Sequence, residues 1–117
     1  MKNFAIVYDD ILGEARLVPV YDLVTTSVYL PKDSMALTMN GRTKWPSSKE
    51  LRRFGETPMG GTPAKVRPIL ERIDEAMAQT KEEIRSYIKE HSEFEEIGER
   101  MLKEWEEGAA QSLRPTS

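Results

Sequence analysis

His91 is the only imidazole in this chain of 117 residues, so histidine-based catalytic triads rest on a single position, and the absence of cysteine excludes cysteine nucleophiles and thiolate zinc sites. Glu95 lies one helical turn further on and could share a metal ion with His91, but two ligands do not form a site. Tyr87 and Phe94 place His91 on an apolar helix face, which is typical of a core or interface histidine. We therefore expect no catalytic residue, no metal site and no cofactor.

The segment 55–62, GETPMGGT, has the glycines of a phosphate-binding loop but lacks its other features. Gly61 stands where the lysine should follow, no apolar strand precedes the segment, and Pro63 removes a backbone N–H from the helix entrance. A weaker anion contact stays open near Gly60, Gly61, Lys65 and Arg67. Neighbouring acidic pairs such as Glu82 and Glu83 point about 100° apart on a helix and indicate solvation. We infer no small-molecule substrate and expect a non-enzymatic protein.

The formal net charge of −3 is the sum of two unlike halves. Residues 1–67 hold ten Lys or Arg and seven Asp or Glu, a balance of +3, whereas residues 68–117 hold seven and thirteen, a balance of −6. This polarity can steer a charged partner, or it can draw the basic part of one copy to the acidic part of another. Solvated charges on exposed faces are the simpler interpretation.

The positive excess of the first half is concentrated between Arg42 and Arg67, and over the segment 42–54 aromatic residues accompany it. Basic residues interleaved with aromatic ones are typical of surfaces that contact nucleic acid or another polyanion. The sequence pI of about 5.3 and the acidic C-terminal half argue against direct nucleic-acid binding. The candidate contacts for an anionic partner are Arg42, Lys44, Trp45, Lys49, Arg52 and Arg53.

The first part of the chain, about residues 3–46, predicts a small antiparallel β-meander. The segment 3–8 is rich in β-formers, the segment 16–21 continues the pattern, and apolar residues alternate over 24–30. Met35, Leu37 and Met39 alternate with Ala36 and Thr38. Asn40-Gly41 is the dipeptide best suited to a type I′ hairpin turn. A sheet this small must pack against a helix or against another chain to be stable.

A short helix is expected near 48–54, because Ser47 and Glu50 have the spacing of a capping box and Gly55 is suited to a helix end. The surrounding segment 47–67 is a basic connector rich in Gly and Pro. Pro68 argues against a regular helix that begins before it. From 68 to 107 strong helix formers follow one another, which predicts a long amphipathic helix, with a break near 91–93 as one alternative.

Steps of four and three from Val66 define an apolar stripe along this helix, with the period typical of a coiled coil. A continuous helix would be about 60 Å long, so most of the stripe would extend beyond a small sheet. Either the helix folds back near 90–93, or it pairs with another helix; the sequence favours pairing. The predicted interface residues are Leu70, Ile73, Met77, Ile84, Tyr87, Phe94, Met101 and Trp105.

We therefore expect one α+β domain, with a tail at 108–117, that self-associates or docks into a larger protein assembly through its C-terminal helix. The alternative is a small regulator or inhibitor of a nucleic-acid-processing complex that uses the basic segment 42–54. The first twenty residues contain Asp9, Asp10 and Glu14 where a signal peptide requires apolar residues. We expect a protein that is cytoplasmic or part of an assembly, neither secreted nor membrane-spanning.

Overall fold

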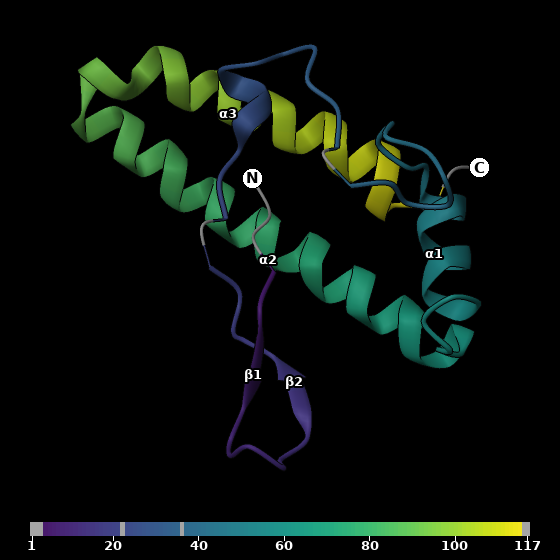
Figure 1. The fold of residues 1–117 in the computed structure, drawn as a ribbon. Coiled ribbons are helices and arrows are strands. Elements are labelled where there is room, and N and C mark those ends of the chain that lie inside the picture. Colours follow the sequence, from purple (N-terminus) through teal and green to yellow (C-terminus); the bar gives the residue numbers. More distant parts are fainter. Residues whose placement is uncertain (1–3, 22, 36, 116–117) are drawn as a thin grey trace.

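A computed structural model describes residues 4–21, 23–35 and 37–115. Within these residues a two-stranded antiparallel sheet precedes the helices α1 (Ser48–Glu56), α2 (Pro63–Glu90) and α3 (Glu95–Gly108) (Figure 1). The predicted α+β class, with strands first and long helices last, is confirmed. Parts of the predicted elements, at Asn3, Ala36 and 116–117, lie outside the described residues.

The sheet is a hairpin of β1 (Ile6–Tyr8) and β2 (Ala15–Leu17), paired in the register Ile6 to Leu17. Asp10 shapes the connection, since its side chain accepts from the N–H of Leu12 at 2.8 Å and its carbonyl accepts from Gly13. An Arg16–Asp9 ion pair bridges the strand ends near the turn.

The remaining strands of the predicted meander are largely absent from the described residues. Thr26–Val28, inside the predicted strand 24–30, forms the 3₁₀ turn η1, because η1 docks against α3 and no strand of the described chain pairs with it. The turn at Asn40-Gly41 is correct: both residues have positive φ, and Met39 and Arg42 form an isolated β-bridge around it. Tertiary contact with a helix therefore outweighed the alternating pattern at 24–30.

The short helix begins where the capping box predicts. The N–H of Glu50 donates to Ser47 Oγ at 3.3 Å, and the N–H of Ser47 donates to Glu50 Oε2 at 2.9 Å. The predicted end at Gly55 is wrong, because α1 continues through Gly55 to Glu56.

Gly55 and Gly61 build a tight corner between α1 and α2, so 55–62 is no open loop. A Cβ on Gly61 would meet Gly55 O at 2.7 Å, and one on Gly55 would meet Val66 Cγ2 at 3.0 Å. The N–H of Gly61 donates to this same Gly55 carbonyl at 2.9 Å. Only glycine permits so close an approach of the two helix ends.

The long helix α2 starts at Pro63, five residues before the predicted start. Pro63 occupies the first turn, where its missing N–H is no loss, and Pro68 is accommodated within the helix. Removing one hydrogen bond near a helix end costs less than losing the buried contacts that the first turns make through Val66.

The helix does not continue to 107 but folds back, the alternative that the sequence disfavoured. His91 leaves helical geometry at φ −132° and ψ 84°, the 3₁₀ turn η2 (Ser92–Phe94) reverses the chain, and α3 returns along α2 (Figure 1). Gly98 is buried in this corner, where a Cβ would meet Ile88 Cγ1 at 2.6 Å. Gly98 occupies a position of the apolar stripe that starts at Val66, and its lack of a side chain permits close packing of the two helices.

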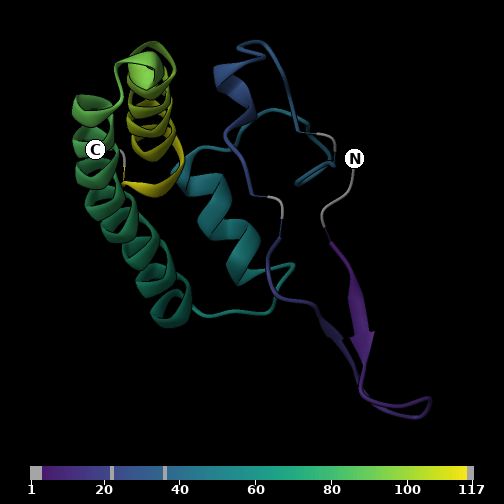
Figure 2. The same ribbon diagram turned by 90° about the vertical axis from the view of Figure 1, so that its left-hand side faces the viewer.

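The core is small and lies among the helices. Its buried apolar residues are Val28, Val66, Leu70 and Ala109, the last in the π-helical turn η3 (Ala109–Leu113) that follows α3. Figure 2 shows α2 and α3 side by side, with α1 and η1 beside them and the β-hairpin projecting away. The radius of gyration, 16.7 Å, exceeds the value of about 13 Å for a compact chain of this length.

Candidate interaction surfaces

The described residues contain no cluster of three or more potential metal ligands. His91 stacks on Tyr87 with ring centroids 3.9 Å apart, and its Nδ1 lies 3.1 Å from the Tyr87 carbonyl. Phe94 meets the same tyrosine edge-on at 5.2 Å. His91 therefore forms part of an aromatic corner at the α2–α3 reversal. Among the described helices, none has the length and apolar character to cross a membrane.

The predicted interface stripe is divided between the interior and the surface. Leu70 is buried, Tyr87 and Phe94 contact each other, and Trp105 donates from Nε1 to Thr25 Oγ1 at 2.7 Å. Ile73 and Tyr87 keep 44% and 49% of their surface exposed. Of the remaining predicted residues, the half-buried ones are Met77, Ile84 and Met101. Intramolecular contacts thus use part of the surface that was predicted to bind a partner.

The basic set is also divided, because its members point to different faces. Arg42 pairs with Glu50 at 3.2 Å, and both residues border a surface hollow together with Arg53. An adjoining hollow adds Lys44 and Trp45. Lys49 is exposed, and Arg52 lines a separate cavity with α2. Of the predicted basic residues, Arg42, Lys44 and Arg53 therefore share one surface.

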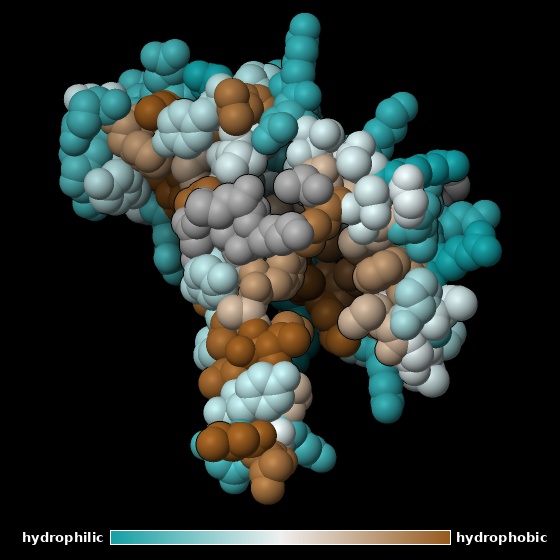
Figure 3. All heavy atoms as spheres, viewed as in Figure 1, coloured by the Kyte–Doolittle hydropathy of each residue, from teal (hydrophilic) through white to brown (hydrophobic). Residues whose placement is uncertain are grey.

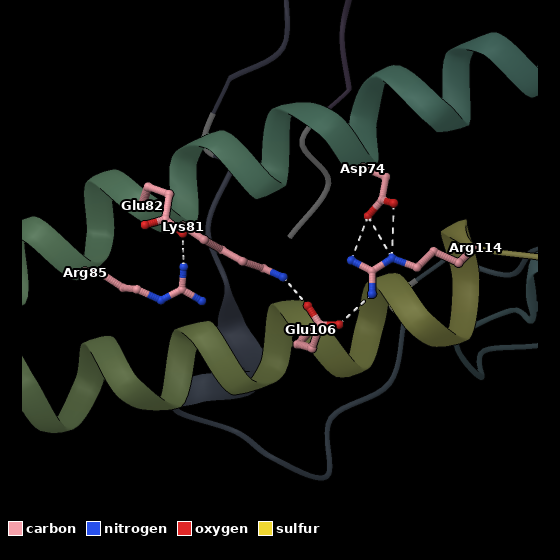
Figure 4. Close-up of polar contacts among 6 residues, drawn as sticks. All are labelled: Asp74, Lys81, Glu82, Arg85, Glu106 and Arg114. Atoms are coloured by element: carbon pink, nitrogen blue, oxygen red, sulfur yellow. Dashed lines mark hydrogen bonds and ion pairs between the residues drawn. The ribbon is translucent and has the colours of Figure 1, made fainter.

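A charged cluster joins α2, α3 and the tail, and no motif in the sequence indicates it (Figure 4). Arg114 Nε donates to both carboxylate oxygens of Asp74, at 3.1 and 3.2 Å, and its Nη1 donates to Glu106. Glu106 also accepts from Lys81, whose side chain is only 7% exposed. Lys81 and Glu106 are 25 residues apart in the sequence, and Asp74 and Arg114 are 40 residues apart. No local pattern could therefore reveal these two pairs.

This cluster and the capping box perturb several ionisation equilibria. Hydrogen bonds from Arg114, and then from Lys81, lower the pKa of Glu106 to about 2. Hydrogen bonds to Asp74 and then to Glu106 raise the pKa of Arg114. The N–H and hydroxyl of Ser47 lower the pKa of Glu50, with a further contribution from Arg42. All these shifts favour the charged forms, as expected of ion pairs that hold a fold together.

The segment 4–24, which includes the β-hairpin, presents the largest set of exposed apolar side chains. Ile11 and Leu12 at the turn are 98% and 96% exposed, and Leu23 is 86% exposed. Figure 3 shows apolar residues covering much of the projecting hairpin. The other exposed members are Phe4, Ile6, Val7, Tyr8, Leu17, Val20, Tyr21 and Val24. Isolated two-stranded hairpins are marginally stable in water, and no described part of the chain covers this one.

Helices that enclose a small core, together with a projecting apolar hairpin, define a small α+β domain with much exposed apolar surface. Residues 1–101 match the family model for the HipA-like C-terminal domain. The match covers most of the chain, and the chain belongs to this family. Neither the curated proteins nor the solved structures contain a significant match.

Proposed function

We propose that this chain is a non-enzymatic interaction domain that assembles with further copies of itself through the segment 4–24. The observation that carries this proposal is the exposure of that segment on both faces of its hairpin. HipA-like C-terminal domains belong to a kinase family related to toxin–antitoxin systems, and a regulatory or interaction role is consistent with this membership. The one histidine, His91, stacks on Tyr87 in the helical corner, which fits a structural role for this imidazole.

The exposed area matches what a dimer requires. If a fully exposed large apolar side chain contributes about 150 Å², the exposed fractions of the apolar residues in this segment give an exposed apolar area on the order of 1,000 Å². Monomeric proteins rarely expose a contiguous apolar patch above a few hundred Å², and a standard interface buries about 800 Å² on each partner. Both edges of the hairpin are also unpaired within the described chain, so a second copy can extend the sheet.

The double variant Ile11→Asp/Leu12→Asp tests this proposal. Both side chains are almost fully exposed, so the fold is retained, whereas charged residues in a dimer interface are costly. We expect the wild-type protein to self-associate with rising concentration in sedimentation equilibrium, and the variant to stay monomeric. Far-UV circular dichroism verifies that the helix content is unchanged.

The matched control is Ile69→Asp/Ile73→Asp, which places two charges on α2, one at the exposed stripe residue Ile73 and one at its exposed neighbour Ile69. We expect this control to associate like the wild type. If Ile69→Asp/Ile73→Asp is monomeric and Ile11→Asp/Leu12→Asp still associates, the interface is the stripe on α2 and not the hairpin. A wild-type protein that is monomeric at every concentration would contradict self-association altogether.

A second candidate function is contact with an anionic partner such as a single-stranded nucleic acid. It is favoured by the two adjoining hollows that Arg42, Lys44, Trp45 and Arg53 border, because a half-exposed tryptophan beside cations suits base stacking. Regulation of a nucleic-acid-processing complex through this surface is the corresponding proposal.

A further inference from the structure

A cavity of about 350 Å³ lies where α1, the first turns of α2 and the residues after η3 meet. Its polar wall consists of Arg52, Arg67 and Arg114 with Glu71 and Asp74. Its apolar wall consists of Leu70, Leu113 and Pro115. Cavities that bind small molecules have this combination, in which apolar walls accompany a few convergent polar groups.

Two of the three arginines already have carboxylate partners. Arg67 Nε donates to Glu71 Oε1 at 2.8 Å, and Arg114 holds both oxygens of Asp74. Glu106, the second partner of Arg114, is balanced by Lys81. The five charged residues that line the cavity therefore leave one positive charge, three cations against two carboxylates.

The uncompensated cation is Arg52. It forms no ion pair with a described residue, and its Nε is buried without a hydrogen-bond acceptor among them. A buried donor without a partner is uncommon, because it loses its hydrogen bond to water and gains none in return. Arg52 also lines the cavity, so an anion that enters the cavity would supply the negative charge that this guanidinium lacks among the described residues.

One uncompensated positive charge favours a monoanion, and the planar guanidinium matches the two oxygens of a carboxylate. Leu70, Leu113 and Pro115 would cover the carbon atoms next to that carboxylate. We propose that the cavity between α1, α2 and residues 113–115 binds a monocarboxylate with a short apolar body, held by Arg52. This site is independent of the proposed self-association.

Titration with hexanoate, followed in the ¹H–¹⁵N spectrum of the arginine Nε–Hε groups, tests the site on the full chain. We expect the Arg52 signal to shift saturably with hexanoate but not with hexanol, which has the same apolar body without the charge. Inorganic phosphate, which lacks the apolar body, should bind more weakly. A linear, unsaturable shift that hexanoate and phosphate share would be ionic screening and would overturn the proposal.

The variant Arg52→Gln, followed through the Nε–Hε signals of Arg67 and Arg114 that also line the cavity, should weaken hexanoate binding by roughly tenfold or more, because it removes a charge-assisted hydrogen-bond pair. Lys49→Gln, an exposed cation on the same helix, should leave binding unchanged. Arg52→Lys keeps the charge without the planar fork and should be intermediate, which also guards against misfolding of the first variant. Equal affinity in wild type and both Arg52 variants would contradict the assignment.

The carboxylate could belong to a free acid or to the C-terminus of a peptide. A short peptide that ends in leucine is therefore titrated with a free and with an amidated C-terminus. Tighter saturation by the free-ended peptide than by hexanoate assigns a peptide terminus as the ligand, and the reverse assigns a free acid. Failure of all the carboxylates to saturate the Arg52 signal would overturn the site.

Discussion

At the residue scale, Glu106 is the carboxylate on which the charged cluster depends. It accepts hydrogen bonds from Arg114 in the tail and from Lys81 on α2, so one side chain links three segments. Lys81 is buried, and a buried ammonium group is retained only when it is paired. The cluster therefore fixes how α3 lies along α2.

We expect Glu106→Gln to change how stability depends on pH. The pKa of Glu106 is about 2 in the folded protein against an ordinary value of 4.5. A lowered folded pKa stabilises the fold above pH 4.5, and this contribution is lost as the pH falls toward 2. The variant should melt at a lower temperature at neutral pH and lose less stability as the pH falls through this range. Glu107→Gln is the control. If the melting temperatures of Glu106→Gln and of the wild type fall in parallel as the pH is lowered, this role of Glu106 is contradicted.

At the element scale, the α2–α3 hairpin depends on the absence of a side chain at Gly98. A Cβ at this position would meet Ile88 at 2.6 and 2.7 Å and Phe94 at 2.9 Å. Contacts this short force the helices apart or push side chains off their rotamers. The reversal at His91 sets the direction of α3, and Gly98 sets how closely it approaches α2.

Gly98→Ala should therefore destabilise the protein by about 1–3 kcal/mol, although alanine is the better helix former. Gly108 is the matched control, since it ends the same helix and a Cβ there would meet nothing within 4 Å. Gly108→Ala should stabilise the protein by up to about 1 kcal/mol. Urea unfolding of both variants measures the two effects. Equal effects of the two substitutions would show that helix propensity, and not packing, decides at Gly98.

At the scale of the whole molecule, the fold separates the cations that are adjacent in sequence. Arg42, Lys44 and Arg53 border the adjoining hollows, whereas Arg52 lies in the cavity against α2. Neutralisation of three phosphates on a single strand gives a slope of about −2 for the logarithm of affinity against the logarithm of salt concentration. A longer contact through the whole segment 42–54 would give a steeper slope.

We therefore expect any binding of a labelled single-stranded oligonucleotide, measured by fluorescence anisotropy, to show a shallow slope of about −2. The charge reversal Arg42→Glu/Arg53→Glu should abolish this binding. Arg72→Glu/Lys89→Glu makes the same change in net charge on exposed positions of α2 and should have a much smaller effect. Equal losses in both double variants would show that only net charge matters and would contradict a localised site.

Features governed by neighbouring residues could be predicted from the sequence. The capping box at Ser47 and Glu50 starts α1, and Asn40-Gly41 adopts positive φ, because each requires contacts only within a few residues. The segment 24–30 is predicted as a strand but contains the 3₁₀ turn η1 at Thr26–Val28 instead, since a strand needs a partner that alternation alone does not supply.

The α+β class, the cap of α1, the glycine turn and the helical character of residues beyond 68 all follow from the amino-acid sequence without a structure. The choice of a fold-back over a continuous paired helix, the packing role of Gly98, and the cluster of Asp74, Lys81, Glu106 and Arg114 are decided only in three dimensions. The same holds for the cavity that Arg52 faces and for the uncovered segment 4–24. The difference is one of range, because dihedral preferences and local hydrogen bonds act between neighbours in sequence, whereas packing and ion pairing act between neighbours in space.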